Sequence, residues 1–225
     1  MKVIAVIPAH NEEKLIADVI RETKRYCDDI IIVDDGSTDK TTEVAKRMGF
    51  KTIKHSTNMG VGAATRTGIV TALGCGADII VTIDGDGQHV PSDIPKLLAA
   101  LDNDTDIVTG SRFLGTKGVP AYRQFGIKVL RFCYNFGNKN KLSDNLFCFR
   151  AFKSKSLEKI DIVENGFGFC SEMLIKARHM GLKIKEVPTN CVYHKKISDN
   201  STFSPIKLGL IIGWKIIVWR LKIEH

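Results

Sequence analysis

The chain lacks a long uninterrupted run of apolar residues. Among its 225 residues the most apolar stretch, 206–219, contains Lys207 and Lys215. A membrane-spanning helix needs roughly 20 apolar residues, so this stretch is too short and too charged to predict a span. The start does not resemble a signal peptide either, because Pro8 ends the apolar run 3–7 before a hydrophobic region of the required length has formed. We expect a globular protein whose first residues are part of the fold.

Metal-type cysteine spacing, internal repeats, low-complexity tracts and clear linkers are also absent. The six cysteines (27, 75, 133, 148, 170 and 191) include no CxxC pair. We therefore expect reduced, partly buried thiols in a cytosolic protein, since a disulfide framework is typical of small secreted chains. Without a linker, the chain is treated as one domain over residues 1–204 followed by a C-terminal helix over 205–225.

Positive charge is unevenly distributed. The net charge is +8, and from Lys176 to the end ten basic residues stand against three acidic ones. A basic tail indicates contact with phosphate, nucleic acid or an anionic membrane surface. Nucleic acid is disfavoured, because the aromatic residues of the tail alternate with aliphatic ones and not with basic residues alone.

Apolar runs alternate with amphipathic segments through the first half. Strands are predicted over 2–7, 30–33, 51–54, 79–83 and 106–109, and helices over 12–25, 41–48, 60–73 and 91–101. This alternation predicts an α/β fold with a mainly parallel sheet covered by helices on both faces. The second half is less regular, with helices predicted over 121–136, 170–180 and 205–221 and short strands over 147–152, 184–187 and 191–193.

Polar clusters follow three of the predicted strands, where folds of this class bind ligands. They are His10-Asn11-Glu12, Asp34-Asp35-Gly36-Ser37 and Asp84-Gly85-Asp86. Two carboxylates one residue apart, at Asp84 and Asp86, suit Mg²⁺ or Mn²⁺ with positions left open for a substrate diphosphate. In isolation the same three residues would be an ordinary solvated turn.

The ordered set of motifs resembles the family 2 glycosyltransferases of the GT-A fold. Their pattern is P-x-x-N-E, V-D-D-G-S-x-D, N-x-G-x-G-x-A, D-x-D and G-S-R, which here begin at Pro8, Val33, Asn58, Asp84 and Gly110. The resemblance covers at least residues 2–112 and extends more weakly to about 194. It implies that a UDP- or GDP-linked sugar is the donor and that the transfer is inverting.

The resemblance also implies roles for individual residues. The nucleotide would be bordered by Pro8, His10 and Glu12, with Val33 and Asp35 at its base. The sugar, diphosphate and metal would be met by Asp84, Gly85 and Asp86, with Gln88 assisting the metal, and Lys195 would lie over the diphosphate. Asp39 is expected to cap the helix from Thr41, and Asp34 to be structural.

The acceptor is predicted from a missing carboxylate. A hydroxyl acceptor usually needs a general base, and polysaccharide-making relatives supply an Asp from a T-E-D-like motif. Here the matching residues are Ser171-Glu172-Met173, so Met occupies the base position. A phosphate acceptor is already anionic at pH 7 and needs no base. We therefore expect a polyprenyl or dolichyl phosphate, with a hydroxyl acceptor and Glu172 as its base left as the alternative.

Two arginines are expected to hold the acceptor phosphate, Arg112 of the G-S-R motif and Arg123. Ala121-Tyr122-Arg123 resembles the F-Y-R segment of dolichyl-phosphate mannose synthases. Solvation or a surface ion pair is the alternative for either arginine. One departure concerns the D-x-x-S-G-F-R-A motif, in which Phe147 and Cys148 replace Ser and Gly. This departure affects the local sugar or acceptor pocket.

The last helix has two tryptophans, many aliphatic residues and lysines at 207, 215 and 222 on one side. This composition predicts a helix lying in a membrane interface, at the cytoplasmic face. The alternative is a helix packed on the domain or in a homodimer, for which Gly209-x-x-x-Gly213 permits close contact. A non-enzymatic nucleotide- or membrane-binding protein is the remaining alternative.

Overall fold

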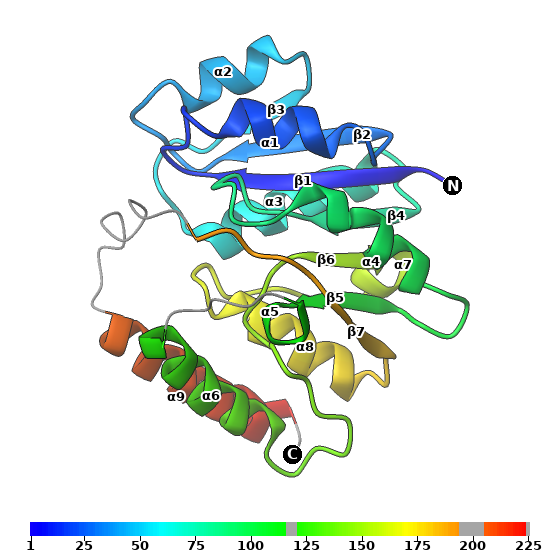
Figure 1. Ribbon diagram of the computed structural model, residues 1–225, viewed down its shortest axis with the longest axis vertical. Helices are drawn as coiled ribbons and strands as arrows, with labels where there is room; N and C mark the ends of the chain where they lie inside the picture. The colour runs from blue at the N-terminus through cyan, green and yellow to red at the C-terminus, as the bar shows by residue number, and fades with distance from the viewer. Residues whose placement is uncertain (116–120, 194–204, 224–225) are drawn as a thin grey trace.

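The computed structural model describes residues 1–115, 121–193 and 205–223 and contains one seven-stranded sheet (Figure 1). The strand order is β3-β2-β1-β4-β6-β5-β7. Along the chain they are β1 (Val3–Ala9), β2 (Asp29–Asp34), β3 (Lys51–Lys54), β4 (Ile79–Thr82), β5 (Ile107–Ser111), β6 (Arg150–Lys153) and β7 (Ile184–Pro188). Only β6 is antiparallel to its neighbours β4 and β5, while the remaining pairs are parallel. The predicted α/β fold with a mainly parallel sheet is confirmed.

Strand β1 is buried along its whole length because helices cover both faces of the sheet. Successive side chains of a strand point to opposite faces. Accordingly Ile4 and Val6 belong to one apolar cluster, whereas Val3, Ala5 and Ile7 belong to the other. This explains why the N-terminal run is continuously apolar and does not alternate with polar residues.

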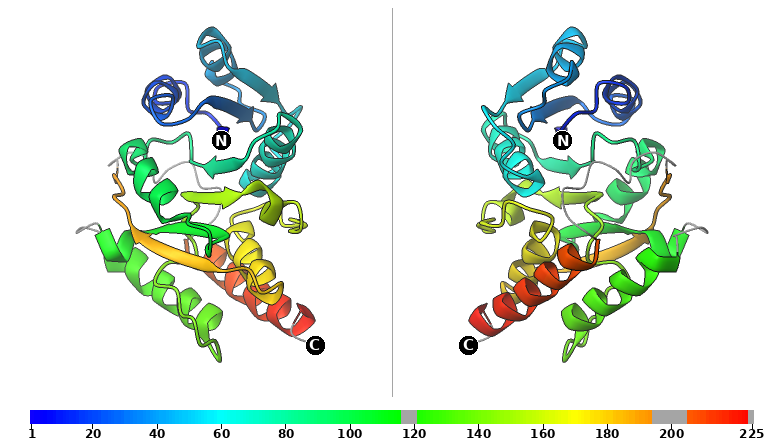
Figure 2. Two further views of the ribbon diagram at one scale, coloured as in Figure 1. Left: turned by 90° about the vertical axis from the view of Figure 1, so that its right-hand side faces the viewer. Right: turned by 90° about the vertical axis from the view of Figure 1, so that its left-hand side faces the viewer.

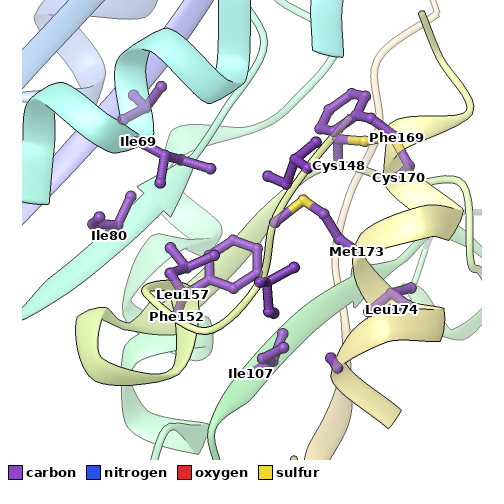
Figure 3. Packing of buried hydrophobic residues seen from close by; sticks show 14 of the residues in the cluster. Ile69, Ile80, Ile107, Cys148, Phe152, Leu157, Phe169, Cys170, Met173 and Leu174 are labelled. Carbon is purple, nitrogen blue, oxygen red and sulfur yellow. A yellow bond between two sulfur atoms is a disulfide. The ribbon is translucent and has the colours of Figure 1, made fainter. Parts of the chain in front are cut away.

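Helices α1 (Ile16–Thr23), α2 (Thr41–Arg47) and α4 (Ile94–Ala100), the last preceded by the short helix η1 (Pro91–Asp93), contribute to the cluster on one face. Helices α3 (Val61–Gly74), α6 (Ala121–Asn135), α8 (Phe169–His179) and α9 (Pro205–Ile223) contribute to the other. Figure 3 shows part of this second cluster, in which Phe152, Met173 and Leu174 pack together. Two further helices of one turn are α5 (Arg112–Gly115) and α7 (Ser154–Leu157).

The order of the strands creates a switch point at the carboxyl end of β1. From β1 the chain adds β2 and β3 on one side and β4 on the other. The loops that leave β1 and β4 therefore diverge to opposite sides, and open α/β sheets bind ligands in the crevice between such loops. The polar clusters predicted from the sequence are placed at this edge of the sheet.

Two predicted strands of the second half are shorter than expected. Strand β6 begins at Arg150 and not at 147, and residues 191–193 form only a single bridge, between Cys191 and His89. Before β6, the carbonyl groups of Asn145 and Phe147 accept hydrogen bonds from the Arg150 side chain.

The expectation of reduced thiols is wrong for Cys148 and Cys170. The structure joins them in a disulfide between the segment before β6 and the first turn of α8, with Cα atoms 5.9 Å apart (Figure 3). The two residues are 22 positions apart and meet because α8 packs beside that segment, where the Arg150 side chain donates to the Cys170 carbonyl. The cysteines at 27, 75, 133 and 191 carry thiols, as expected.

Helix α9 lies beside α6 at the end of the molecule next to β7, as both views of Figure 2 show. Its Ile212 and Ile216 are buried in the same cluster as β1, so part of this helix belongs to the core. Gly213 faces α6, since a Cβ there would lie 3.3 Å from Leu130. Over the described residues, none of the helices combines the length and apolarity needed to cross a bilayer.

Two glycines of α3 predict opposite responses to the same substitution. A Cβ at Gly62 would lie 2.2 Å from the Glu164 carbonyl oxygen, whereas a Cβ at Gly74 meets nothing within 4 Å. Because a backbone atom cannot move aside cheaply, we expect Gly62→Ala to lower the free energy of unfolding by about 1–3 kcal/mol. Gly74→Ala should leave it unchanged or raise it slightly, because alanine favours the helix. Denaturant unfolding of both variants measures the difference, and equal values would contradict the close approach at Gly62.

Candidate functional site

The loops after β1 and β2 are joined by hydrogen bonds. Nδ1 of His10 donates to the Asp35 carbonyl at 2.8 Å, which leaves Nε2 to accept from the Asn11 side chain at 3.1 Å. The Asn11 N–H donates to Ser37 Oγ at 2.9 Å, with Asn11 in the left-handed region at φ 57°. The His10 ring is thus fixed. The expected contact of Pro8, His10 and Glu12 with the nucleotide stays a prediction.

Asp35 is almost fully buried beneath this edge. Its Oδ1 is 2.7 Å from Nδ1 of His55 and accepts the Met59 N–H, while Oδ2 accepts the Gly60 N–H at 2.7 Å. These contacts shape the loop that leads into α3. The expected contact of Asp35 with the nucleotide base stays a prediction, as does that of Val33, whose side chain is fully buried in the core on the α3 side.

Two other acidic residues of the second loop support the backbone. Asp34 is structural, as expected, and accepts from the Ser37 N–H at 2.9 Å and from the Thr42 hydroxyl. The N-cap of α2 is Lys40 and not the expected Asp39, but Asp39 accepts the N–H of Thr41, the first residue of α2, at 2.9 Å, and also the Glu13 N–H at 3.1 Å. Asp39 therefore ties the first loop to the start of α2.

The turn after β4 brings Asp84 and Asp86 against the end of β1. The Gly85 N–H donates to the Pro8 carbonyl at 3.0 Å, and a Cβ at Gly85 would lie 3.0 Å from Ala9 Cβ. Any larger residue at position 85 would require its neighbours at the end of β1 to shift by a few tenths of an ångström. The Gln88 N–H donates to Asp86 Oδ1 at 2.9 Å, which closes the turn.

Negative charge is concentrated and partly desolvated here. Burial, together with the smaller effects of the charges of Asp86, Asp39 and Asp84, raises the pKa of Glu12 to about 7. Burial also raises the pKa of Asp84 to about 6, against the opposing effect of Arg112 and Arg150. The cluster formed by Glu12, Asp84 and Asp86 is referred to below as the carboxylate cluster.

His89, which the sequence pattern does not single out, supports this turn. Nδ1 of His89 accepts the Asp84 N–H at 3.0 Å, so the proton is on Nε2, which lies 3.6 Å from Asp84 Oδ2. Phe149 stacks on the ring at 5.2 Å, and burial lowers the pKa of His89 to about 4, which keeps it neutral. A buried histidine between aromatic side chains cannot be distinguished from an ordinary core residue by sequence pattern.

Arg112 is engaged by an acidic residue that was also missed. Its Nε and Nη2 donate to Oδ2 and Oδ1 of Asp144 at 2.7 and 2.9 Å, and Asp144 is fully buried. The neighbouring carboxylate raises the pKa of Arg112 further above its ordinary value. Arg112 lies at the start of α5, beyond the carboxyl end of β5, and its guanidinium faces Phe147 at 4.8 Å from the ring centroid.

Arg150, a third missed residue, is fully buried, and its hydrogen-bond partners among the described residues are all neutral oxygens. Nε donates to the Phe147 carbonyl and Thr109 hydroxyl, Nη1 to the Cys170 carbonyl at 2.8 Å, and Nη2 to the Asn145 carbonyl at 3.1 Å. Burial lowers its pKa to about 10, so it remains charged at neutral pH.

The remaining predicted residues are placed as follows. Arg123 lies in α6, but its side chain is outside the described residues, as is Lys195. Glu172 is fully buried and accepts from the Glu164 N–H at 2.9 Å and from Lys176 at 2.7 Å. These contacts give Glu172 a structural role and do not favour the alternative in which it acts as a base.

Residues 4–161 match the model of the family described as Glycosyl transferase family 2. The chain belongs to this family. It is 34% identical to the UDP-N-acetylglucosamine–dolichyl-phosphate N-acetylglucosaminyltransferase of Methanococcus voltae, over 94% of this chain and 91% of that protein. It is 32% identical to the dolichol-phosphate mannosyltransferase of Pyrococcus furiosus, over 84% of this chain and 56% of that protein. The protein is therefore a family 2 glycosyltransferase, and the expected branch with polyprenyl-phosphate sugar transferases is confirmed.

The solved structures similar to this glycosyltransferase confirm the GT-A fold. One is glucosyl-3-phosphoglycerate synthase from Mycobacterium tuberculosis in complex with Mn²⁺, UDP and phosphoglyceric acid, with a TM-score of 0.74 and 19% identity. The match covers 99% of this chain and 78% of that one. At this identity the likeness concerns the fold.

The carboxylate cluster suits a divalent cation whose remaining coordination positions are filled by the substrate. Over the described ranges, no three His, Cys, Asp or Glu side chains are grouped to hold a metal by themselves. Mg²⁺, however, usually binds one or two carboxylates together with substrate phosphates and water. The two aspartates of the glycosyltransferase, of which Asp84 has a pKa raised by burial, suit that mode and not a closed structural site.

The raised pKa of Glu12 predicts a pH dependence of stability when cations are removed by a chelator. Its folded value of about 7 exceeds the ordinary 4.5, so the folded state binds more protons at intermediate pH. The free energy of unfolding should therefore fall as pH rises from about 4.5 through about 7. Glu12→Gln should flatten this decline, leaving the contribution of Asp84, which has the same sign. Denaturant unfolding at several pH values measures both slopes, and parallel slopes would contradict the assignment.

Proposed function

We propose that the protein is a metal-dependent, inverting glycosyltransferase that moves a sugar from a nucleotide sugar to a polyprenyl or dolichyl phosphate. The observation that carries the proposal is the juxtaposition of the carboxylate cluster with two arginines, the partly buried Arg112 and the fully buried Arg150. The cluster suits a cation-bound diphosphate, and Arg112 at its margin suits an anionic acceptor. The names of the relatives support the same donor and acceptor classes.

The donor would bind across the carboxyl ends of β1, β2 and β4. Pro8, His10 and Glu12 border the nucleotide, with Val33 and Asp35 beneath its base. Asp84 and Asp86, with Gln88, would hold Mg²⁺ or Mn²⁺, which neutralises the charge of the departing diphosphate. Neighbouring structures of the same fold contain Mn²⁺ and UDP, which supports this choice of cation and donor.

The acceptor phosphate attacks the anomeric carbon on the side opposite the diphosphate. The new bond joins a phosphate oxygen to that carbon while the bond to the diphosphate oxygen breaks, and the nucleoside diphosphate leaves with the electron pair. A single displacement of this kind inverts the configuration. The attacking oxygen is already anionic at neutral pH, since the second phosphate pKa is about 6, so no protein base is required.

A hydroxyl acceptor is the second candidate. It would require a base near the anomeric carbon, and the residue at the expected helix position, Glu172, is buried and paired with Lys176. This arrangement favours the phosphate.

We further propose that α6 and α9 together face the membrane. Both helices expose large apolar side chains, among them Phe132 of α6 and Leu210, Trp214 and Leu221 of α9. Aromatic and aliphatic side chains on paired helices suit a lipid interface. The lysine face expected on α9 is interrupted, because Lys215 pairs with Glu164 at 2.6 Å. Apolar burial would then contribute more than charge, and peripheral binding at the cytoplasmic face stays a prediction. Gly213 already contacts α6 within one chain, and a homodimer stays a prediction.

The first test is a transfer assay with a panel of UDP- and GDP-sugars, a short water-soluble prenyl phosphate and Mn²⁺ or Mg²⁺. Prenyl-phosphate sugar should form only with a cation and disappear with excess chelator. Asp86→Ala should reduce transfer at least about a hundredfold, because one lost ligand weakens the hold on diphosphate charge. Its melting temperature in chelator should match the wild type, since Asp86 is not in the core. Full activity in chelator, or transfer only to hydroxyl acceptors, would refute the proposal.

The second test measures cosedimentation with anionic liposomes. The double variant Phe132→Ser, Trp214→Ser should lose most binding, because burying each ring in the interface contributes roughly 1.5–3 kcal/mol. Val70→Ser provides a matched control, because Val70 is also exposed but lies on α3. The double variant should retain transfer to the short prenyl phosphate. Unchanged liposome binding would exclude α6 and α9 as the membrane-facing surface.

A further inference from the structure

Phe147 is one of the two residues at which the chain departs from the family motif, and it lies between Arg112 and the turn that carries Asp84 and Asp86. Phe147 stands where relatives have Ser, and only about 4% of its surface is exposed. Its ring centroid is 4.8 Å from Arg112 Cζ and 4.4 Å from the His89 ring, which it meets edge-on at 80°. It therefore contacts both the arginine at the acceptor side and the histidine behind Asp84.

The turn formed by residues 144–147 holds Arg112 from two directions. Asp144 binds the guanidinium edge carrying Nε and Nη2, and Phe147, three residues later, lies against the guanidinium. The turn is itself fixed, because the Asp144 N–H donates to Glu186 and the Phe147 carbonyl accepts from Arg150 Nε at 3.0 Å. An arginine held by a carboxylate and an aromatic ring loses most of its rotational freedom before any ligand binds.

The Phe147 ring also contacts the residues that are expected to bind the donor. Phe147 packs on His89, and Nδ1 of His89 accepts the Asp84 N–H. A displacement of the phenyl ring would therefore move both Arg112 and the support of the Asp84–Asp86 turn. A serine at this position could make neither contact, because it has no ring.

We propose that Phe147 is a positioning residue that fixes Arg112 for an anionic acceptor and couples it, through His89, to the aspartates that receive the diphosphate. The role for Arg112 rests on the proposed function. The coupling of the three side chains is independent of it and is tested separately below.

The matched pair of variants is Phe147→Leu and Phe149→Leu. Both rings are buried against His89, but only Phe147 contacts Arg112. Phe147→Leu should raise the KM for a short prenyl phosphate roughly threefold to thirtyfold, the range expected for losing one cation–π contact. Phe149→Leu should change the acceptor KM less than twofold. Both variants can perturb the donor KM through His89, so the acceptor KM separates them.

A double-mutant cycle tests whether Phe147 acts through Arg112. In an Arg112→Lys background, whose charge remains to balance Asp144, the effect of Phe147→Leu on the acceptor KM should shrink to less than half of its wild-type value. Additive effects would overturn the positioning role, as would an unchanged acceptor KM in the single variant.

A readout without substrate keeps the two proposals distinguishable. In ¹⁵N-arginine-labelled protein, the Arg112 Nε–H signal, assigned by its loss in Arg112→Lys, should exchange slowly with water. The exchange should accelerate at least about tenfold in Phe147→Leu, because water can reach Arg112 once the ring is removed. It should stay slow in Phe149→Leu. If the wild-type protein transfers no sugar to prenyl phosphate, the proposed function fails. The exchange rate still tests whether Phe147 holds Arg112 in place. Equal exchange in both variants overturns this role.

Discussion

The carboxylate cluster at the carboxyl edge of the sheet is the constraint on which the rest of the site depends. Glu12, Asp84 and Asp86 come from loops after two neighbouring strands, and Gly85 lets them approach by packing directly on the end of β1. Bringing like charges together where water is partly excluded is unfavourable, and the raised pKa values of Glu12 and Asp84 express that cost. A bound cation would remove this cost, which supports the proposed binding of a metal ion together with a diphosphate.

The second half of the chain provides the opposing charge. The antiparallel strand β6 inserts between β4 and β5, and its first residue, Arg150, is buried among carbonyl oxygens, with no carboxylate of the described residues hydrogen-bonded to it. Arg112 is bonded to Asp144, and the charges of both arginines act on Asp84. Negative charge on one side of this edge and positive charge on the other would suit the proposed transfer, in which a diphosphate leaves and a phosphate enters.

The sequence was sufficient to predict the α/β fold, the parallel strands of the first half and the family, because continuous apolar runs and five ordered motifs are local signals. It did not reveal Asp144, His89 or Arg150, since their importance arises from contacts between segments far apart in the chain. The depth of Asp35 and Val33 was also not predictable, because a motif gives position along the chain and not burial. Similarly, apolar residues and lysines on α9 suggested a surface helix, whereas Ile212 and Ile216 pack in the core and Lys215 pairs with Glu164.

The most direct measurement of the central claim is calorimetry of Mn²⁺ binding, in the presence of UDP or GDP, in buffers of different ionisation enthalpy near pH 6.5. If the cation binds a carboxylate cluster whose protons are held by burial and mutual repulsion, its binding must release protons. The apparent binding enthalpy should vary with the ionisation enthalpy of the buffer, in the direction expected when the buffer takes up released protons. Fewer protons should be released at pH 8, where the carboxylates are already ionised. Cation binding with no proton release at pH 6.5, or no binding at all with either nucleotide, would contradict it.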